Sequence, residues 1–243
     1  MTAPALQTAP ETSLPAGNRA AFIEDFIGRT LMILWFTTAT WIHVTQMITA
    51  IKASGVDPYW FLAVAHSLLL ISFSGLAALL TVIRNPTKAV ATGIEPRVSA
   101  LLGTFLILTL PFLPGAENGV AVQFVALPIT FIGLVGAIYC MAWLGRSFAI
   151  MAAARNLVTG GPYSVVRHPL YATELVAIFG VVLSSLSPIA IVIFVLVTAF
   201  QIRRTYNEER VLRAAFPEYE EYAKRVPRII PRLPFGRTAP KPL

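Results

Sequence analysis

Two short polar segments, one on each side of a hydrophobic stretch, contain most of the side chains that could do chemistry. The first segment, residues 155–171, includes a Gly-Gly-Pro sequence at 160–162 that predicts a turn. Pro169 suits the first position of a helix and disfavours helix in the residue before it. We therefore expect a helix to begin at Arg167-His168-Pro169, where its partial positive charge favours a nearby anionic group.

The second segment, residues 203–212, carries paired charges of opposite sign. If the hydrophobic stretch before it continues as a helix, Arg204 and Glu208 share a face, and Glu209 lies beside Arg213, because residues four apart are neighbours. Spacing alone leaves two interpretations of Arg204 and Glu208. They form either a functional pair or only a surface ion pair, which contributes about 0.3 to 0.5 kcal/mol.

Two further residues also have a functional and a structural interpretation. His168, followed by proline, could be no more than a helix start. Glu174 lies early in the next hydrophobic helix, and an acid inside a membrane is by default a functional candidate. An acid near a helix N-terminus can instead simply complement the helix dipole. The sequence leaves both alternatives open.

The rest of the chain is strongly apolar. Apolar residues make up 56% of the 243 positions and charged residues only 13%, against about 25% in a soluble domain. A helix that crosses the hydrocarbon core needs about 20 apolar residues. Four spans are predicted at residues 31–51, 60–83, 98–113 and 121–144, of which the third is on the short side. Two shorter apolar runs follow at 169–183 and 188–200.

The two short runs raise the question of how the chain ends its path through the membrane. Fifteen helical residues rise only about 22 Å, so the pair is either a hairpin of short helices or two full crossings. The sequence predicts an all-α integral membrane protein of about six hydrophobic helices, the last two a short helical hairpin, with a cytoplasmic C-terminal helical segment. We expect residues 1–28 to be a disordered tail with an interfacial helix over 19–28, and residues 29–144 to form a four-helix transmembrane region.

Basic residues are very unevenly distributed. With six spans, eighteen of the nineteen Lys and Arg residues fall on one side of the membrane and only Lys52 on the other. Positive residues stay in the cytoplasm, so both termini should lie there, in what we expect to be a bacterial inner membrane. The net charge of +7 clusters beside hydrophobic spans, so we assign it to membrane lipids and not to nucleic acid. Cys140 is alone and the three histidines are far apart, so no metal site is expected.

Five ordered sequence elements resemble the signature of the isoprenylcysteine carboxyl methyltransferase family, which is related to membrane phospholipid methyltransferases. They are Leu-Val-Thr-x-Gly-Pro-Tyr and Arg-His-Pro-x-Tyr in the first segment, then Arg-x-x-x-Glu-Glu-x-x-Leu, Phe-Pro-Glu-Tyr-x-x-Tyr and Val-Pro-Arg-x-Ile-Pro after the hairpin. The resemblance makes residues 145–243 a methyltransferase-like region that contains the hairpin. The first four spans match no motif, and we expect them to be a membrane scaffold.

The resemblance implies that S-adenosylmethionine is the methyl donor. It implies Arg204 and His168 as catalytic residues, with Arg204 facing a hydrophobic or lipid-attached methyl acceptor that enters from the bilayer. A second tier of site residues is expected nearby: Arg167, Glu174 and Glu209. The motif positions imply the following cofactor-binding residues: Leu157, Val158, Tyr163, His168, Pro169, Tyr171 and Glu208.

The sequence departs from the family pattern in two places. Arg155 and Asn156 stand where the better-known eukaryotic members have other polar residues, so both are left out of the predicted site. Thr173 replaces a glycine that often follows the tyrosine by two residues. We expect the larger side chain to narrow the space where the cofactor meets the helix.

Three functions remain open at this level. The first is methylation of a carboxylate on a prenylated or other hydrophobic acceptor, which needs alignment and exclusion of water but no general base. The second is methylation of a lipid amine or thiol, whose acceptor must first lose a proton. The third is a non-enzymatic membrane scaffold or a component of a transporter.

Overall fold

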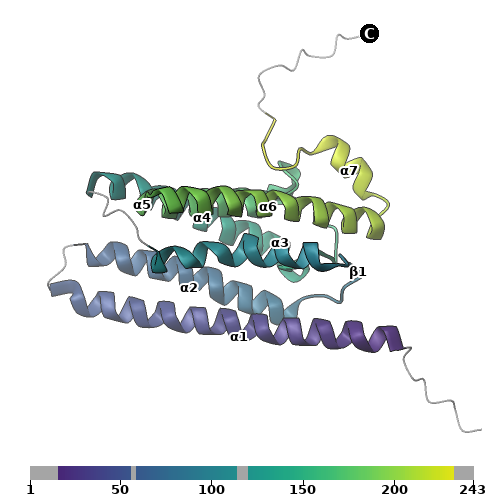
Figure 1. The fold of residues 1–243 in the computed structure, drawn as a ribbon, viewed down its shortest axis with the longest axis horizontal. Helices are drawn as coiled ribbons and strands as arrows, with labels where there is room; N and C mark the ends of the chain where they lie inside the picture. The colour runs from purple at the N-terminus through teal and green to yellow at the C-terminus, as the bar shows by residue number, and fades with distance from the viewer. Residues whose placement is uncertain (1–15, 56–58, 114–119, 233–243) are drawn as a thin grey trace, which may run out of the picture.

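The computed structural model describes residues 16–55, 59–113 and 120–232, which form a bundle of long helices (Figure 1). The two longest helices span Ala16–Lys52 and Pro188–Ala215, with 37 and 28 residues. The α-helices are α1 (Ala16–Lys52), α2 (Trp60–Ile83), α3 (Ile94–Phe105), α4 (Val120–Leu144), α5 (Pro169–Ser184), α6 (Pro188–Ala215) and α7 (Tyr219–Arg225). The 3-10 segments are η1 (Ala53–Gly55), η2 (Leu106–Phe112), η3 (Gly145–Ser147) and η4 (Gly161–Ser164).

The bundle confirms the prediction of an α-helical membrane protein. In the described ranges, five helical stretches are long and apolar enough to cross a membrane, and α5 is a shorter apolar helix. The helix α2 coincides with the span predicted at 60–83, and α3 continues through η2 to cover the third span. The sequence therefore placed the apolar helices well, because apolar runs of this length are a local property of the chain.

The hairpin differs from the prediction in its second helix. α5 is short, with 16 residues, but α6 does not end near Phe200 and continues to Ala215. Its 28 residues rise about 42 Å, so the prediction of two short helices is wrong for α6. Gln, Arg and Glu residues after the apolar run are good helix formers, so the helix continues through this polar segment. This extension carries both Arg204 and Glu208.

The N-terminal region also differs from the prediction. Residues 1–15 of the predicted tail lie outside the described residues, and from Ala16 the chain is helical. The predicted interfacial helix over 19–28 is therefore the first part of α1 and not a separate element. A two-residue antiparallel pair, β1 (Ala89–Val90) with β2 (Ala153–Ala154), was not predicted, and it ties the connection after α2 to the connection after α4.

Small residues let α4 and α5 pack closely. A Cβ atom added at Gly133 would lie 2.5 Å from the Cα of Ala177, and one at Gly180 would lie 2.6 Å from the backbone nitrogen of Thr130. Close approach through glycine and other small residues is the usual way in which membrane helices associate. Thr173 belongs to this interface, because its Cγ2 lies 2.7 Å from a Cβ built at Gly136. The expectation that Thr173 narrows the cofactor space is wrong, since Thr173 faces α4.

The charged segments gather at one end of the bundle. The start of α1, the β1 strand and α7 all lie at the same end in Figure 1. Arg84 at the end of α2 lies 2.7 Å from Asp25 of α1, and Arg155 after β2 lies 3.6 Å from the same carboxylate oxygen. The bundle thus brings together segments that the distribution of Lys and Arg predicts to lie on one side of the membrane. The division into regions at 28/29 and 144/145 stays a prediction, and Asp25 with Arg155 links the first region to the last.

Candidate active site

A pocket opens at the charged end, between the end of α4, the start of α5, the outer part of α6 and α7. The volume that its walls enclose is about 80 Å³, and the pocket is partly open to solvent. Its walls are formed by Leu144, Ser147, Ala149, Met151, Ala153, Asn156, Leu157, Val158, Tyr163, Arg167, His168, Leu170, Tyr171, Glu208, Leu212, Tyr219 and Tyr222.

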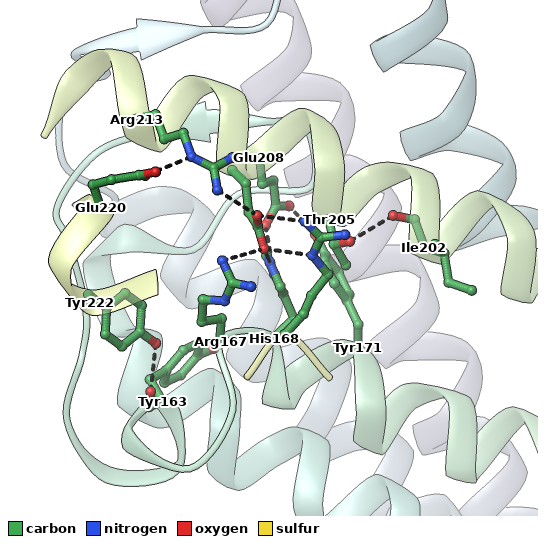
Figure 2. Close-up of polar contacts among 12 residues, drawn as sticks. Tyr163, Arg167, His168, Tyr171, Ile202, Thr205, Glu208, Arg213, Glu220 and Tyr222 are labelled. Atoms are coloured by element: carbon green, nitrogen blue, oxygen red, sulfur yellow. Dashed lines mark hydrogen bonds and ion pairs between the residues drawn. The ribbon is translucent and has the colours of Figure 1, made fainter. Parts of the chain in front are cut away.

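The Gly-Gly-Pro turn builds one wall of the pocket. Gly161 has φ of +58°, a conformation that residues with a side chain rarely adopt, and a Cβ there would lie 2.5 Å from the Trp143 indole. The turn delivers Tyr163 to a buried position, where its backbone oxygen accepts a 2.6 Å hydrogen bond from Tyr222 (Figure 2). Burial raises the pKa of Tyr163 and also raises the pKa of Tyr219, to about 12. These phenols stay neutral near pH 7.

His168 occupies the position before α5, as the sequence predicted, and Pro169 is the first helical residue. The imidazole stacks on the Tyr171 ring at 5.7 Å between centroids, with only 12° between the planes. Its Nε2 lies 3.3 Å from Glu209 and its Nδ1 lies 3.7 Å from Glu208. His168 is therefore both a helix start and a pocket residue held between two carboxylates.

Glu208 presents its carboxylate to the pocket. Its side chain keeps 22% of its surface exposed, and the Tyr171 hydroxyl donates a hydrogen bond to it. Figure 2 shows Glu208, His168 and Tyr171 grouped where α5 meets α6. A partly exposed carboxylate beside an aromatic stack provides hydrogen-bond acceptors for a ligand with hydroxyl or ammonium groups.

Glu209 has the opposite environment, because it is fully buried. Arg228 donates two hydrogen bonds of 2.8 Å to its two oxygens, and Arg167 lies 3.1 Å away. Arg213 lies at 3.4 Å, which confirms the predicted pair with Glu209. The bidentate contact raises the pKa of Arg228. Glu209 thus binds the segment after α7 to the start of α5.

Backbone hydrogen bonds reinforce this connection. The amides of Arg167 and His168 donate to the carbonyls of Pro227 and Arg228 at 2.8 and 2.9 Å. The Arg228 guanidinium also lies over the Tyr206 ring, 3.8 Å from its centroid. The Val-Pro-Arg element therefore acts as a strap that holds the Arg-His-Pro element in place beside the pocket.

Arg204 is buried and lies outside the pocket walls. Its terminal nitrogens donate to Gln201, Thr104 and the Ile150 carbonyl at 2.8, 3.1 and 3.0 Å. Its guanidinium lies 4.5 Å from the centroid of the Tyr171 ring, which does line the pocket, and its Nε has no partner among the described residues. The interpretation of Arg204 as half of a surface ion pair is wrong, because the side chain is buried.

Glu174 belongs to the same buried polar group as Arg204. Its carboxylate accepts a 2.9 Å hydrogen bond from Gln201, which also accepts from Arg204. It contacts α6 across the helix pair and does not line the pocket. Pro169 and Glu209 also lie outside the walls. Seven predicted site residues line the pocket: Leu157, Val158, Tyr163, Arg167, His168, Tyr171 and Glu208.

Several pocket residues were missed from the sequence. Asn156 was set aside as a departure from the family pattern, yet it lines the pocket. Tyr219 and Tyr222 lie in the Phe-Pro-Glu-Tyr-x-x-Tyr element, and that element could have identified them. Met151 and Ala153 had no motif, because only the β1–β2 pairing brings their segment to the pocket.

Comparisons with known proteins agree with this geometry. Residues 119–219 match the family model described as "Phospholipid methyltransferase", and this range contains α4, α5 and α6. The chain is 36% identical over 142 residues to the cobalt-zinc-cadmium resistance protein CzcN of Cupriavidus metallidurans, which covers 55% of this chain and 62% of that protein. It is 36% identical over 115 residues to the nickel-cobalt-cadmium resistance protein NccN of Alcaligenes xylosoxydans xylosoxydans, covering 44% of this chain and 52% of that protein. The matches thus span between half and two thirds of these two relatives.

A third relative identifies the family. The chain is 31% identical over 132 residues to protein-S-isoprenylcysteine O-methyltransferase B of Arabidopsis thaliana, which covers 51% of this chain and 67% of that enzyme. These matches, together with the apolar helices, indicate the class of the membrane methyltransferase families. Within that class, the chain belongs to the isoprenylcysteine carboxyl methyltransferase-like family.

Proposed function

We propose that this protein is an S-adenosylmethionine-dependent methyltransferase of the membrane, and that the pocket at the charged end holds the methyl donor. The observation that carries the proposal is the contrast between two successive glutamates. Glu209 is fully buried by its basic partners, whereas Glu208 presents a carboxylate to the pocket. Family membership supports the same activity.

The residues of the pocket fit this donor. Glu208 can accept hydrogen bonds from ribose hydroxyls or from the amino group, and Leu157 and Val158 offer an apolar surface to a flat base. The ring of Tyr163 lines the pocket and suits a cationic sulfur, because the face of an aromatic ring attracts positive charge. When bound, S-adenosylmethionine supplies a methyl group on a positively charged sulfur.

The chain itself contributes position and exclusion of water. His168 is fixed between the two glutamates and stacked on Tyr171, so it defines one side of the pocket. Tyr222 closes another side through its hydrogen bond to the Tyr163 carbonyl. A methyl transfer between oppositely charged partners gains from alignment and from a dry environment more than from proton transfer.

We further propose that the acceptor is the carboxylate of a prenylated or other hydrophobic molecule that enters from the bilayer. Arg204 supports this assignment, since its buried guanidinium lies next to the pocket residue Tyr171 and its Nε has no hydrogen-bond partner among the described residues. A guanidinium is well suited to orient a carboxylate. The match to the phospholipid methyltransferase model supports the alternative, in which the acceptor is a lipid amine or thiol.

The orientation in the membrane is part of the proposal. We place the charged end in the cytoplasm, both termini included, and the membrane as a bacterial inner membrane. The support is the concentration of Lys and Arg at that end, since basic residues remain cytoplasmic. The pocket then opens to the compartment in which S-adenosylmethionine is made.

Binding of the demethylated cofactor tests the pocket. Purified protein in detergent should bind S-adenosylhomocysteine in a calorimetric titration. Glu208→Ala should weaken the binding by about 1.5 to 3 kcal/mol, the usual loss for a hydrogen bond to a charged group. Glu221→Ala is the matched control, because this glutamate is exposed on α7 and lies outside the pocket. Absence of heat with the wild type, or equal affinity in Glu208→Ala, would contradict the proposal.

The dependence of the rate on pH tests the acceptor. Labelled methyl donor supplied to membranes with and without the protein should first identify the methylated product. A carboxylate is already ionised, so the methyl-transfer rate should be nearly flat from about pH 6 to 9, whereas an amine acceptor predicts a rate that rises with pH. Arg204→Lys should lower turnover and leave cofactor affinity nearly unchanged, because it keeps the charge and loses the planar fork. A steep rise in rate across this range would favour the amine alternative.

A further inference from the structure

Four charged side chains meet at the charged end where α1 and α2 leave the membrane: Asp25, Arg29, Arg84 and Arg155, here named the Asp25 cluster. Arg84 lies 2.7 Å and Arg155 lies 3.6 Å from the same oxygen of Asp25. Arg29 follows Asp25 by four residues on α1 and so lies on the same face of that helix. None of the four lines the methyltransferase pocket.

The charges of the cluster do not balance. Three guanidinium groups face one carboxylate, which leaves an excess of two positive charges among the described side chains. The side chains of Arg84 and Arg155 are only 7% and 2% exposed. The Nε atoms of Arg29, Arg84 and Arg155 are buried and have no hydrogen-bond partner in the part of the chain that the structure describes. Buried charges and donors without partners are costly, so an anion that bound these arginines would stabilise the folded protein.

The electrostatics of the two buried arginines point the same way. Burial lowers the pKa of Arg155 to about 10, and repulsion from Arg84 adds to the effect. Burial also lowers the pKa of Arg84, and Arg29 adds to that effect. The fold therefore holds both guanidinium groups in an environment that disfavours their charge. A bound anion would raise the pKa of both groups and so favour the charged forms.

The position of the cluster indicates where the anion comes from. Arg84 directly follows Ile83, the last residue of the candidate span of α2, which places the cluster near the level of the lipid headgroups. Asp25 is 46% exposed, so the cluster opens on the side of α1. Phe26 and Ile27 are exposed beside it and provide an apolar surface for acyl chains.

We propose that the Asp25 cluster binds the phosphate group of an anionic membrane lipid. Guanidinium groups form paired hydrogen bonds with phosphate oxygens, and a monoanionic headgroup would offset half of the excess charge. The site is separate from the pocket and does not depend on the proposed methyltransferase activity. It stabilises the junction of α1, α2 and β2 at the membrane surface, because Arg155 directly follows β2.

Lipid titration of the full chain tests the proposal. The protein in detergent is titrated with phosphatidylglycerol, phosphatidylcholine or inorganic phosphate, and retained ligand is counted by native mass spectrometry. Arg29→Gln is the test variant, since it removes one charge of the cluster and leaves the contacts of Asp25 with Arg84 and Arg155 in place. Arg225→Gln is the control, because Arg225 is an exposed basic residue of α7.

Wild type and Arg225→Gln should retain phosphatidylglycerol at least about tenfold better than phosphatidylcholine. Arg29→Gln should lose about five- to tenfold of that affinity, and its Tm in detergent without lipid should not fall. Equal loss in Arg29→Gln and Arg225→Gln would overturn the site, because only general surface charge would then matter. Inorganic phosphate that binds as tightly as the lipid would overturn the lipid assignment in favour of a soluble phosphate.

Discussion

Two regions at the outer end of α6 differ sharply although adjacent residues of the same type define them. Around Glu209, three arginines and His168 surround one carboxylate that has no exposed surface. Around Glu208, an aromatic stack and apolar side chains leave the carboxylate partly exposed to a pocket. One region is closed on itself and the other is open to a ligand.

The difference shows how two successive residues of one helix can have separate roles, one in holding the fold together and one in facing a binding pocket. Successive residues on a helix point about 100° apart, so Glu209 turns toward the strap after α7 while Glu208 turns toward α5. A carboxylate can be fully buried only where cations and hydrogen bonds compensate for its lost hydration. Glu209 has that compensation, whereas Glu208 remains partly exposed and can bind a ligand in the pocket.

The largest expected effect tests the closed region. Glu209→Ala leaves Arg167, Arg228 and His168 without their shared partner, so it should lower the free energy of unfolding by about 3 to 5 kcal/mol. The measurement is thermal or denaturant unfolding in detergent. Glu208→Ala, made in parallel, should lower stability by less than about 1 kcal/mol, because its side chain is partly exposed.

Similar stability losses in the two variants would break the comparison, since the two glutamates would then have one shared structural role. The control Glu221→Ala should change stability by no more than about 0.5 kcal/mol, because its ion pairs are exposed.

A smaller effect than that of Glu209→Ala is expected at the boundary between the two regions. Tyr222 lines the pocket and donates a 2.6 Å hydrogen bond to the Tyr163 carbonyl. Tyr222→Phe keeps the ring and removes that bond, so it should lower stability by about 0.5 to 1.5 kcal/mol. Tyr139→Phe is the matched control, because Tyr139 is exposed on α4. Equal unfolding midpoints for the two variants would mean that this bond does not hold the pocket wall.

Much of the site could be predicted because its parts are short, ordered elements. The Gly-Gly-Pro turn, the helix start at His168 and the pairing of Glu209 with Arg213 are all local consequences of residue type and spacing. The prediction was less successful where a side chain's neighbours come from other helices. Spacing alone allowed a surface ion pair of Arg204 with Glu208, but Arg204 lies buried among Gln201, Thr104 and the Ile150 carbonyl.

The sequence by itself determined the apolar helices, the segregation of positive charge and the order of the family elements. These properties depend on hydropathy and periodicity, which are readable one segment at a time. Only the tertiary structure decided that Thr173 packs against Gly136, that Arg155 joins Asp25 and that Asn156 lines the pocket. The physical reason is that the direction of a side chain depends on how its helix or strand is rotated against its neighbours. Close contacts such as those of Gly133 and Gly180 set that rotation between segments far apart in the chain.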